Sequence, residues 1–334
     1  MPQAAITRRR FITIAASGMA IAALGNVRAA WTRDIAPMRW RGSALGAQVS
    51  IDIHHPDPRA AMELVDASVH MVRRFERLFS LYRSDSAICE LNRSGVLIAP
   101  EPDMVELLRA ALRLSQLTDG AFDPTVQPLW QCCERHFARA GADAAGPPPR
   151  ELAEALAKVG YAGLRVSDDR IALARHGASI TLNGIAQGYA TDRVVELLRR
   201  GGLSTTLVDI GEIRAIGARP DGTPWRIGLA DADAAGRTFA TIDLIDRAVA
   251  TSSGSGFRFD RDGKFNHLFD PATGRSSARY RSVSVVAATA TEADALSTAF
   301  SVMSEQHIAE LVAARPGLEV VLSNAAGQLR TLRS

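Results

Sequence analysis

Hydrophobic positions recur at helical spacing in several parts of the chain, and short apolar runs separate them. The spacing predicts helices over 58–81, 103–118 and 150–159, another that ends at Gly201, and a last one over 292–304. Apolar runs predict strands between about 40 and 60 and at 178–182, 205–209 and 282–287. Helices and strands interleave without a regular βαβ period. This pattern favours an α+β fold with mixed or antiparallel sheets and packed helices over a doubly wound fold.

A glycine-bearing turn joins the predicted strand at 178–182 to the helix that follows. Gly184 and Gly188 both lie between Thr181 and Asp192. Glycine in such a turn lets backbone N–H and C=O groups approach a phosphate or a metal closely. Many turns of this kind carry glycine only for packing, so this segment has a structural interpretation as well.

The first 30 residues differ from the rest of the chain. Three arginines at 8–10 precede an apolar run over 11–24, and Val-Arg-Ala at 27–29 offers a small-residue cleavage site. The run is too short for a hydrocarbon core that needs roughly 20 residues. We therefore predict a twin-arginine signal peptide over 1–30 and export to the periplasm. Retention as an uncleaved anchor is the alternative.

The charge and cysteine content exclude several classes of protein. The predicted leader holds four arginines and no acid, so without it the formal charge falls from +3 to −1. No basic stripe with interleaved aromatic residues is present, which argues against nucleic-acid binding. The cysteines are Cys89 and the adjacent Cys132 and Cys133, an odd number that does not fit a disulfide scaffold. No Cys/His spacing typical of a metal site occurs.

The last predicted helix carries polar residues of an unusual kind. Asp294 and Thr298 are four residues apart and share one face, which otherwise has only short polar side chains. A carboxylate and a hydroxyl are hard oxygen ligands that suit Mg²⁺ shared with a phosphate. Thr291 and Asp294 also fit the spacing of a capping box, which gives Asp294 a structural alternative.

A hairpin is predicted around Asp262 and Gly263, a dipeptide that favours a two-residue turn. That loop would place Arg258 opposite His267 on one face. A neighbouring cation would keep the imidazole of His267 neutral and able to accept a proton. A single histidine on a strand can also be purely structural.

Two further residues are candidates for ligand contacts. Tyr82 follows the first long helix, where it could stack on a planar ring or form part of the core. Asp123 precedes Pro124, a pair that favours a turn. Its carboxylate either caps that turn or accepts a hydrogen bond from a sugar hydroxyl or a base.

These segments, in this order, resemble the ApbE family of FAD:protein FMN transferases from about residue 40 to 325. Each motif is modest, and the ordered set is specific. The resemblance rests on Ser-Leu-Tyr at 80–82 with Ser86 and Asn92, Gly-Ala-Phe-Asp-Pro-Thr at 120–125, Gly-Ile-Ala-Gln-Gly-Tyr-Ala-Thr-Asp at 184–192, Ala-Thr-Ser-Ser-Gly at 250–254, His-Leu-Phe-Asp-Pro-Ala-Thr-Gly at 267–274, and Asp294 with Thr298.

The resemblance implies an ApbE-like fold and a definite reaction. Family members bind FAD, use Mg²⁺, attach FMN through a phosphoester to a threonine or serine hydroxyl of a partner protein, and release AMP. By position, the Gly184 carbonyl, Asp294 and Thr298 would hold the metal. His267 would take the proton from the acceptor hydroxyl. The expected FAD contacts are Tyr82, Ala121, Phe122, Asp123, Thr181, Gln187 and Leu268.

The chain departs from the family pattern at two of these positions. Many relatives have aspartate at the position of Thr181 and a longer charged residue, often lysine, at that of Gln187. A FAD pyrophosphatase that releases FMN and AMP, and a flavin-binding carrier without turnover, are therefore alternative functions. A twin-arginine leader on such a chain is similar to accessory flavin transferases of nitrous oxide respiration. Their expected acceptor is a membrane-bound, FMN-binding electron-transfer protein that acts as a regulator.

Overall fold

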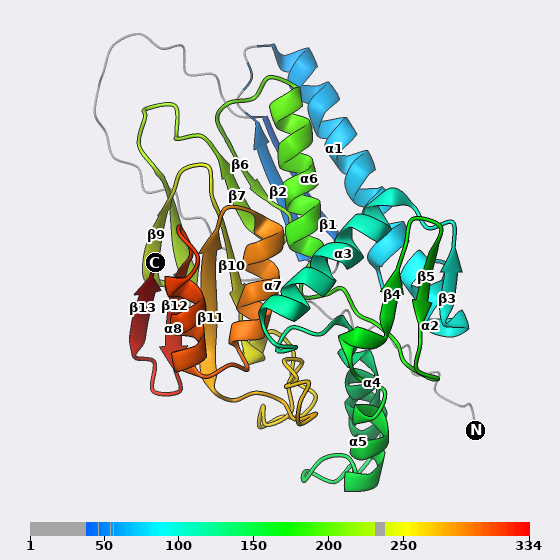
Figure 1. Cartoon of the computed structure of the whole chain (residues 1–334). Coiled ribbons are helices and arrows are strands. Elements are labelled where there is room, and N and C mark those ends of the chain that lie inside the picture. Colours follow the sequence, from blue (N-terminus) through cyan, green and yellow to red (C-terminus); the bar gives the residue numbers. More distant parts are fainter. Residues whose placement is uncertain (1–37, 46, 54, 56, 231–237) are drawn as a thin grey trace, which may run out of the picture.

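The computed structural model describes residues 38–45, 47–53, 55, 57–230 and 238–334. Over this part of the chain the predicted α+β class is confirmed, because helices pack against antiparallel sheets (Figure 1). The predicted signal peptide at 1–30 lies outside the described residues. Within the described ranges, no helix combines the length and the apolar character that a membrane crossing requires.

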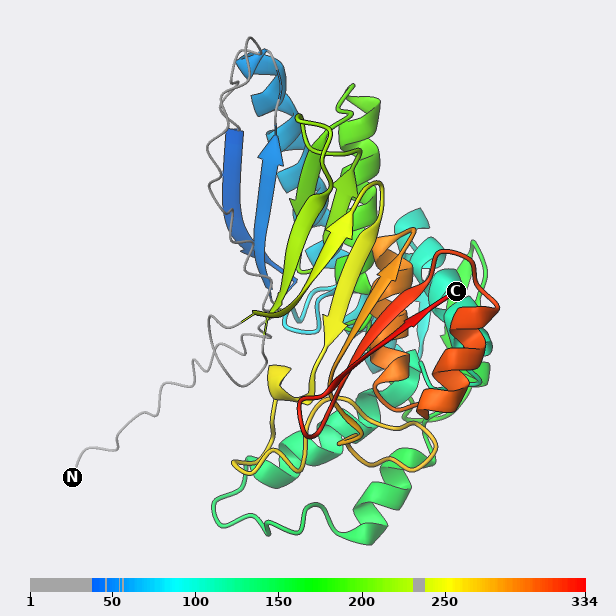
Figure 2. The same ribbon diagram turned by 90° about the vertical axis from the view of Figure 1, so that its left-hand side faces the viewer.

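A large sheet forms the centre of the molecule, and every neighbouring pair of its strands is antiparallel. Figure 2 shows the strands fanning across the molecule from one end of the chain to the other. In spatial order they are β1 (Met38–Ala44), β2 (Ala47–Ile53), β6 (Thr206–Asp209), β7 (Ile213–Ile216), β10 (Ala248–Ser252), β11 (Tyr280–Ala287), β12 (Glu319–Asn324) and β13 (Leu329–Arg333).

The central strands are buried on both faces. Side chains alternate across a strand, so neighbours in sequence point to opposite faces of the sheet. Ala250 and Val285 belong to the main core under the helices, whereas Val249 and Val286 belong to a second core. A hairpin of β8 (Trp225–Ala230) and β9 (Thr238–Leu244) covers this second core.

The remaining elements complete the main core and one smaller sheet. The smaller sheet contains β3 (Val96–Ile98), β5 (Arg170–Leu173) and β4 (Leu164–Val166). The helices are α1 (Pro58–Phe79), α2 (Ala87–Ser94), α3 (Pro102–Leu117), α4 (Gln127–Phe137), α5 (Pro149–Leu156), α6 (Ala186–Arg200), α7 (Ala290–Phe300) and α8 (Glu305–Ala313).

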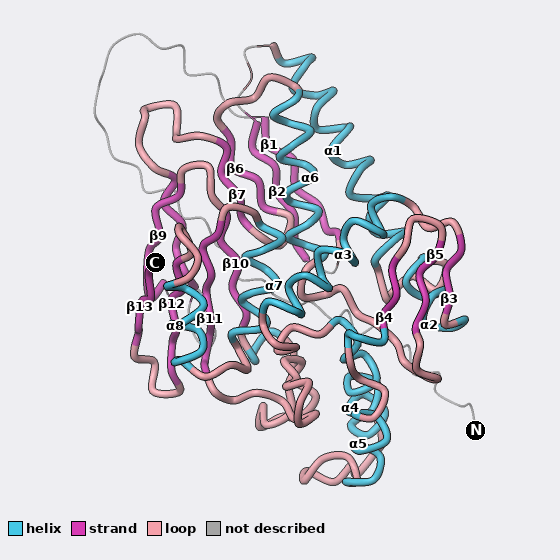
Figure 3. Tube along the Cα trace, in the orientation of Figure 1, coloured by secondary structure: helices cyan, strands magenta, loops and turns pink. Residues whose placement is uncertain are grey.

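Helices α4 and α5 extend from the main body as an arm (Figures 1 and 2). The segment between β10 and β11 runs beside this arm and is mostly irregular (Figure 3). Aromatic contacts join the two, including Trp130 against Phe257 with ring centroids 4.6 Å apart. A third small core of buried residues, among them Leu129, Cys132 and Phe269, fills the space between them.

Two predicted elements differ from the structure. Residues 178–182 form no strand, and the side chain of Asn92 makes the backbone hydrogen bonds that a strand neighbour would make. Its amide donates to the Ile180 carbonyl at 2.8 Å and accepts from the Ile180 N–H at 2.7 Å. The predicted helix over 292–304 ends early: α7 stops at Phe300, and α8 begins at Glu305.

Candidate active site

The predicted site residues gather in one cleft between the sheet, the α4 arm, the first turn of α6 and one face of α7. The sequence analysis named eleven site residues. Ten of them line this cleft, and Tyr82 does not. Residues from β7, β8 and β10 complete the wall. The ten are Ala121, Phe122, Asp123, Thr181, Gly184, Gln187, His267, Leu268, Asp294 and Thr298.

The three candidate metal ligands come from two elements that touch. A Cβ added to Gly184 would lie 2.8 Å from the Thr298 hydroxyl oxygen, so only glycine permits this approach without a shift. Asp294 lies one turn before Thr298 on α7 and is 4% exposed. Burial raises the pKa of the Asp294 carboxyl to about 7. A cation at this carboxylate would therefore replace lost solvation.

Within the described residues, no group of three or more His, Cys, Asp and Glu side chains is arranged to hold a metal ion. The predicted ligand set is of a different kind, because it pairs one carboxylate with a hydroxyl and a backbone carbonyl. Such mixed oxygen sets bind Mg²⁺ together with substrate phosphates.

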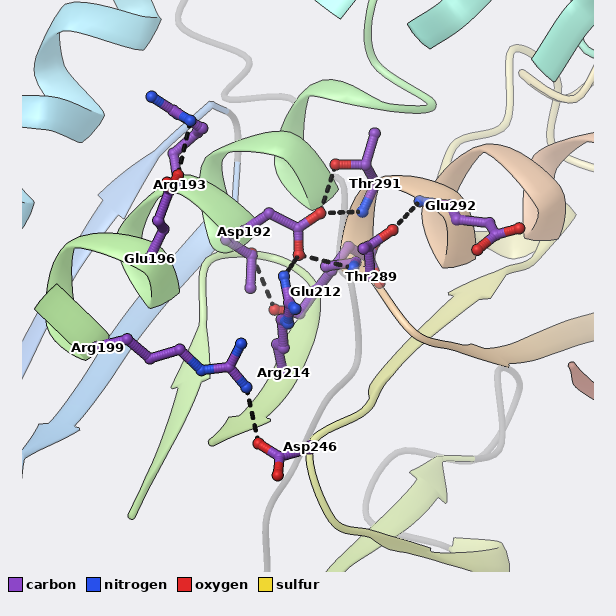
Figure 4. Close-up of polar contacts among 12 residues, drawn as sticks. Asp192, Arg193, Glu196, Arg199, Glu212, Arg214, Asp246, Thr289, Thr291 and Glu292 are labelled. Atoms are coloured by element: carbon purple, nitrogen blue, oxygen red, sulfur yellow. Dashed lines mark hydrogen bonds and ion pairs between the residues drawn. The ribbon is translucent and has the colours of Figure 1, made fainter. Parts of the chain in front are cut away.

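A carboxylate from each of the helices α6 and α7 accepts hydrogen bonds from N–H groups in the first turn of the other helix. The Gly188 N–H in the first turn of α6 donates to Asp294 Oδ2 at 3.0 Å. In return, Asp192 of α6 accepts from the N–H groups of Ala290 and Thr291 in the first turn of α7 (Figure 4). Both carboxylates satisfy N–H groups that have no partner inside their own helix. Their negative charge also suits the positive end of the helix dipole.

The capping box predicted from Thr291 and Asp294 is wrong. The N-cap of α7 is Thr289, whose hydroxyl accepts from the Glu292 N–H at 3.2 Å. Thr291 lies inside the helix, and its hydroxyl donates to Asp192 at 2.5 Å. The prediction failed because the helix begins earlier than its apolar pattern.

His267 lies in the irregular segment between β10 and β11, and its predicted partner is wrong. Arg258 bridges to Asn266, one position away from the expected register. The turn is wider than two residues because the Asp260 side chain accepts from the N–H groups of Lys264 and Phe265.

The neutral state predicted for His267 has a different cause from the one expected. Burial, and no neighbouring cation, holds the pKa of its imidazole below the usual value. Nδ1 lies 3.2 Å from the Phe257 carbonyl oxygen. A carbonyl can only accept, so Nδ1 carries the proton and Nε2 keeps a lone pair. His267 therefore has the tautomer of a base.

Asp123 caps its turn, as the structural alternative predicted. Its Oδ1 accepts from the Thr125 N–H at 2.7 Å and from the Thr125 hydroxyl at 2.6 Å. Its Oδ2 accepts from the Tyr161 N–H at 2.8 Å. Burial raises the pKa of this carboxyl, while these hydrogen bonds lower it. Asp123 thus holds the α4 arm in place and also lines the cleft.

Gln187 and Thr181 also line the cleft. The Gln187 amide donates to the Leu45 carbonyl at 3.2 Å and so ties α6 to the β1–β2 turn. The Thr181 N–H donates to the Pro124 carbonyl at 2.8 Å, which links the glycine turn to the turn of Asp123. Both residues position the backbone around the cleft.

Tyr82 stands at the edge of this site. Its side chain is 52% exposed, and its hydroxyl bonds to the side chain of Asn183, a residue that lines the cleft. Partial burial and the negative charge of Glu134 raise the pKa of the phenol. Tyr82 is therefore available to a ligand that extends out of the cleft.

Comparison with known proteins identifies the relatives of this chain. The model of the ApbE family matches residues 45–322. The chain belongs to the ApbE family. It is 30% identical over 304 residues to the FAD:protein FMN transferase of Salmonella typhimurium, which covers 86% of this chain and 84% of that protein. The enzyme of the same name from Escherichia coli is 29% identical over 297 residues, covering 86% of this chain and 84% of the relative.

Solved structures of ApbE proteins have the same fold. The ApbE protein of Thermotoga maritima matches with a TM-score of 0.79 and 30% identity, covering 89% of this chain and 97% of that one. The flavin transferase ApbE of Vibrio cholerae matches with a TM-score of 0.74 and 27% identity, with the same coverage of the two chains.

One acidic residue of this ApbE cleft was not predicted. Glu212 lines the cleft and is 7% exposed. Burial raises the pKa of its carboxyl well above the usual value, and the charges of Asp294 and Asp209 raise it further. Burial also raises the pKa of Asp209 to about 6. One sequence signal could have identified Glu212. Asp209 and Glu212 flank Gly211 where β6 ends and β7 begins.

Proposed function

We propose that this chain transfers FMN from FAD to a threonine or serine hydroxyl of a partner protein and releases AMP. The observation that carries the proposal is the cleft itself. It brings the hard oxygen donors of Asp294, Thr298 and Gly184 together with a neutral imidazole at His267. Relatives that match most of this chain carry the name FAD:protein FMN transferase.

Mg²⁺ fits the donors at the glycine turn. The Asp294 carboxylate is buried, and the Gly184 backbone comes close to the Thr298 hydroxyl because no side chain intervenes. When bound, Mg²⁺ would neutralise charge on the pyrophosphate oxygens of FAD. The protein contributes by holding α7 against the turn so that both donors face the cleft.

His267 would act as the general base. Its Nδ1–H is held by the Phe257 carbonyl, so Nε2 is the atom that accepts the proton of the acceptor hydroxyl. The hydroxyl oxygen then bonds to the phosphorus of the FMN half of FAD. The bond between that phosphorus and the bridging oxygen breaks, and AMP leaves with that oxygen.

The remaining walls suit a flavin dinucleotide. Phe122 and Leu268 supply buried apolar surface, and Tyr82 at the edge could stack on a ring. Export through the twin-arginine pathway, proposed from residues 1–30, would place the enzyme in the periplasm. Its acceptor would then be an exported, FMN-binding electron-transfer protein.

The test is a labelling experiment with purified protein, FAD, Mg²⁺ and a recombinant FMN-binding domain that carries the acceptor threonine. A Thr→Ala version of that domain is the control. Transfer produces flavin fluorescence that stays with the threonine-bearing domain on a denaturing gel and is absent from the control.

Two other outcomes would contradict the proposal. Free FMN and AMP without labelled protein would identify a FAD pyrophosphatase. Unchanged FAD that remains bound to the purified protein would identify a flavin-binding carrier.

A further inference from the structure

Asp192 of α6 binds the first turn of α7 through three hydrogen bonds (Figure 4). It accepts from the Ala290 N–H at 2.8 Å, the Thr291 N–H at 2.9 Å and the Thr291 hydroxyl at 2.5 Å. The next N–H, that of Glu292, donates to Thr289. Asp192 therefore satisfies backbone donors that α7 cannot satisfy by itself.

A strand of the central sheet fixes the same carboxylate from the other side. Arg214 of β7 forms an ion pair with Asp192, and the two side chains are 12% and 14% exposed. Hydrogen bonds to charged groups are shorter and stronger than neutral ones. One carboxylate thus joins α6, α7 and the sheet.

Two further contacts follow the one at Asp192. They proceed toward the start of α6 and toward the end of α7. Asp192 meets the first turn of α7, Gly188 meets Asp294, and Gly184 meets Thr298. A Cβ on Gly188 would lie 2.3 Å from a backbone oxygen of α7, so the helices are in direct backbone contact there. The register of α6 against α7 therefore determines where Asp294 and Thr298, the two candidate metal ligands on α7, lie relative to Gly184.

We propose that Asp192 is a positioning residue for the metal-binding face of α7. It is absent from the residues that line the cleft and acts by fixing the register in which Asp294 and Thr298 meet Gly184. This inference rests on the proposed binding of Mg²⁺ at that face. It assigns to Asp192 a role in metal affinity that is separate from its contribution to folding.

The direct test is Asp192→Asn, with Mg²⁺ itself as the probe. The amide keeps the shape and one accepting oxygen, but it places an NH₂ group where a second N–H or Arg214 now donates. Changes to residues that support metal ligands typically weaken metal binding by about 10- to 100-fold. We expect the apparent dissociation constant for Mg²⁺ to rise by about tenfold or more.

The measurement needs neither acceptor nor turnover. Thermal unfolding is followed as Mg²⁺ is added, and the dissociation constant comes from the rise in Tm with concentration. The Tm without Mg²⁺ reports the purely structural effect of the substitution. A residue that only stabilises the fold would lower that Tm and leave the Mg²⁺ midpoint unchanged.

Glu196→Gln is the matched control. Glu196 lies one turn further along α6 and pairs with two residues of its own helix, Arg193 (Figure 4) and Arg200. The control is expected to keep the wild-type response to Mg²⁺. A wild-type midpoint in Asp192→Asn, whatever its Tm, would overturn the inference.

A milder variant decides the question if Asp192→Asn does not fold. Thr291→Val removes only the hydroxyl that donates to Asp192. We expect Mg²⁺ to bind about fivefold more weakly, the equilibrium effect of a typical hydrogen bond. No change would overturn the inference, and so would a wild-type protein that Mg²⁺ does not stabilise. A wild type that binds Mg²⁺ through this arrangement but labels no acceptor would instead refute the proposed function alone.

Discussion

The Gly188 N–H donates to Asp294 Oδ2 at 3.0 Å, which joins the glycine turn to the last helix of the cleft. This bond uses one oxygen of a buried carboxylate to satisfy a free N–H in the first turn of α6. Asp294 therefore has a structural role beside the metal-binding role proposed for it. The carboxylate is held by a backbone donor, which only proline at position 188 would remove directly.

We predict that Asp294→Asn loses Mg²⁺-dependent labelling while remaining folded. The amide oxygen can still accept from the Gly188 N–H, but the negative charge that would attract Mg²⁺ is gone. A buried carboxylate carries a desolvation cost that a neutral amide avoids. The Tm without Mg²⁺ should therefore be no lower than that of the wild type, and added Mg²⁺ should not raise it.

Asp294→Ala is the companion variant. It removes the acceptor as well and leaves the Gly188 N–H without a partner, so its Tm should fall below that of Asp294→Asn. Normal labelling by either variant would remove Asp294 from the mechanism.

We predict that Gly188→Ala destabilises the protein by about 1–3 kcal/mol, the usual cost of overpacking. The new Cβ would lie 2.3 Å from the Ala290 carbonyl oxygen and 2.6 Å from its carbon, so α7 must move. Urea unfolding measures the change. Gly163→Ala is the control, because its nearest new contact is 3.7 Å from Arg175 Cγ. Equal stability of the two variants would contradict the direct backbone contact of α6 with α7 at Gly188.

The sequence predicted the parts of the site that depend on local spacing. Asp294 and Thr298 share a face because residues four apart on any helix do so. The glycine turn and the helix after it were also predictable, because Gly201 ends the helix and apolar positions mark its buried side. The metal site that these oxygen donors suggest stays a prediction.

The parts that failed depend on side chains that replace backbone partners. The strand at 178–182 is missing because Asn92, which is 88 residues away from Ile180, occupies the position of a neighbouring strand. Arg258 lies opposite Asn266, one residue away from the predicted partner His267, because the Asp260 side chain caps a wider turn. The spacing of residues along the chain does not predict hydrogen bonds from side chains or from residues that are distant in sequence.

We predict that His267→Ala lowers the labelling rate by about 10²- to 10⁴-fold, the usual contribution of a general base. FAD affinity, measured by flavin fluorescence, should change little, because the imidazole acts on the acceptor hydroxyl. His267→Asn is the stricter control, since its amide can still donate to the Phe257 carbonyl but offers no base. A His267→Asn protein that labels at the wild-type rate would exclude His267 as the base.

The pH dependence of labelling follows from the state of His267. Burial lowers the pKa of the imidazole below its ordinary value of about 6.5, although the hydrogen bond to Phe257 opposes this shift. The base is neutral above its pKa, so the rate should stay constant at neutral pH when saturating Mg²⁺ keeps Asp294 ionised. It should fall as the pH drops through the lowered pKa, below about 6.5.

The same shift predicts that folding stability also declines there, because the unfolded chain binds the proton more readily than the folded one. Labelling rates between about pH 5 and 8, at saturating FAD and Mg²⁺, test the catalytic part. The residual activity of His267→Ala should lack this acid limb. A wild-type rate that already falls between about pH 8 and 7 would show that another group, with a raised pKa, controls the reaction.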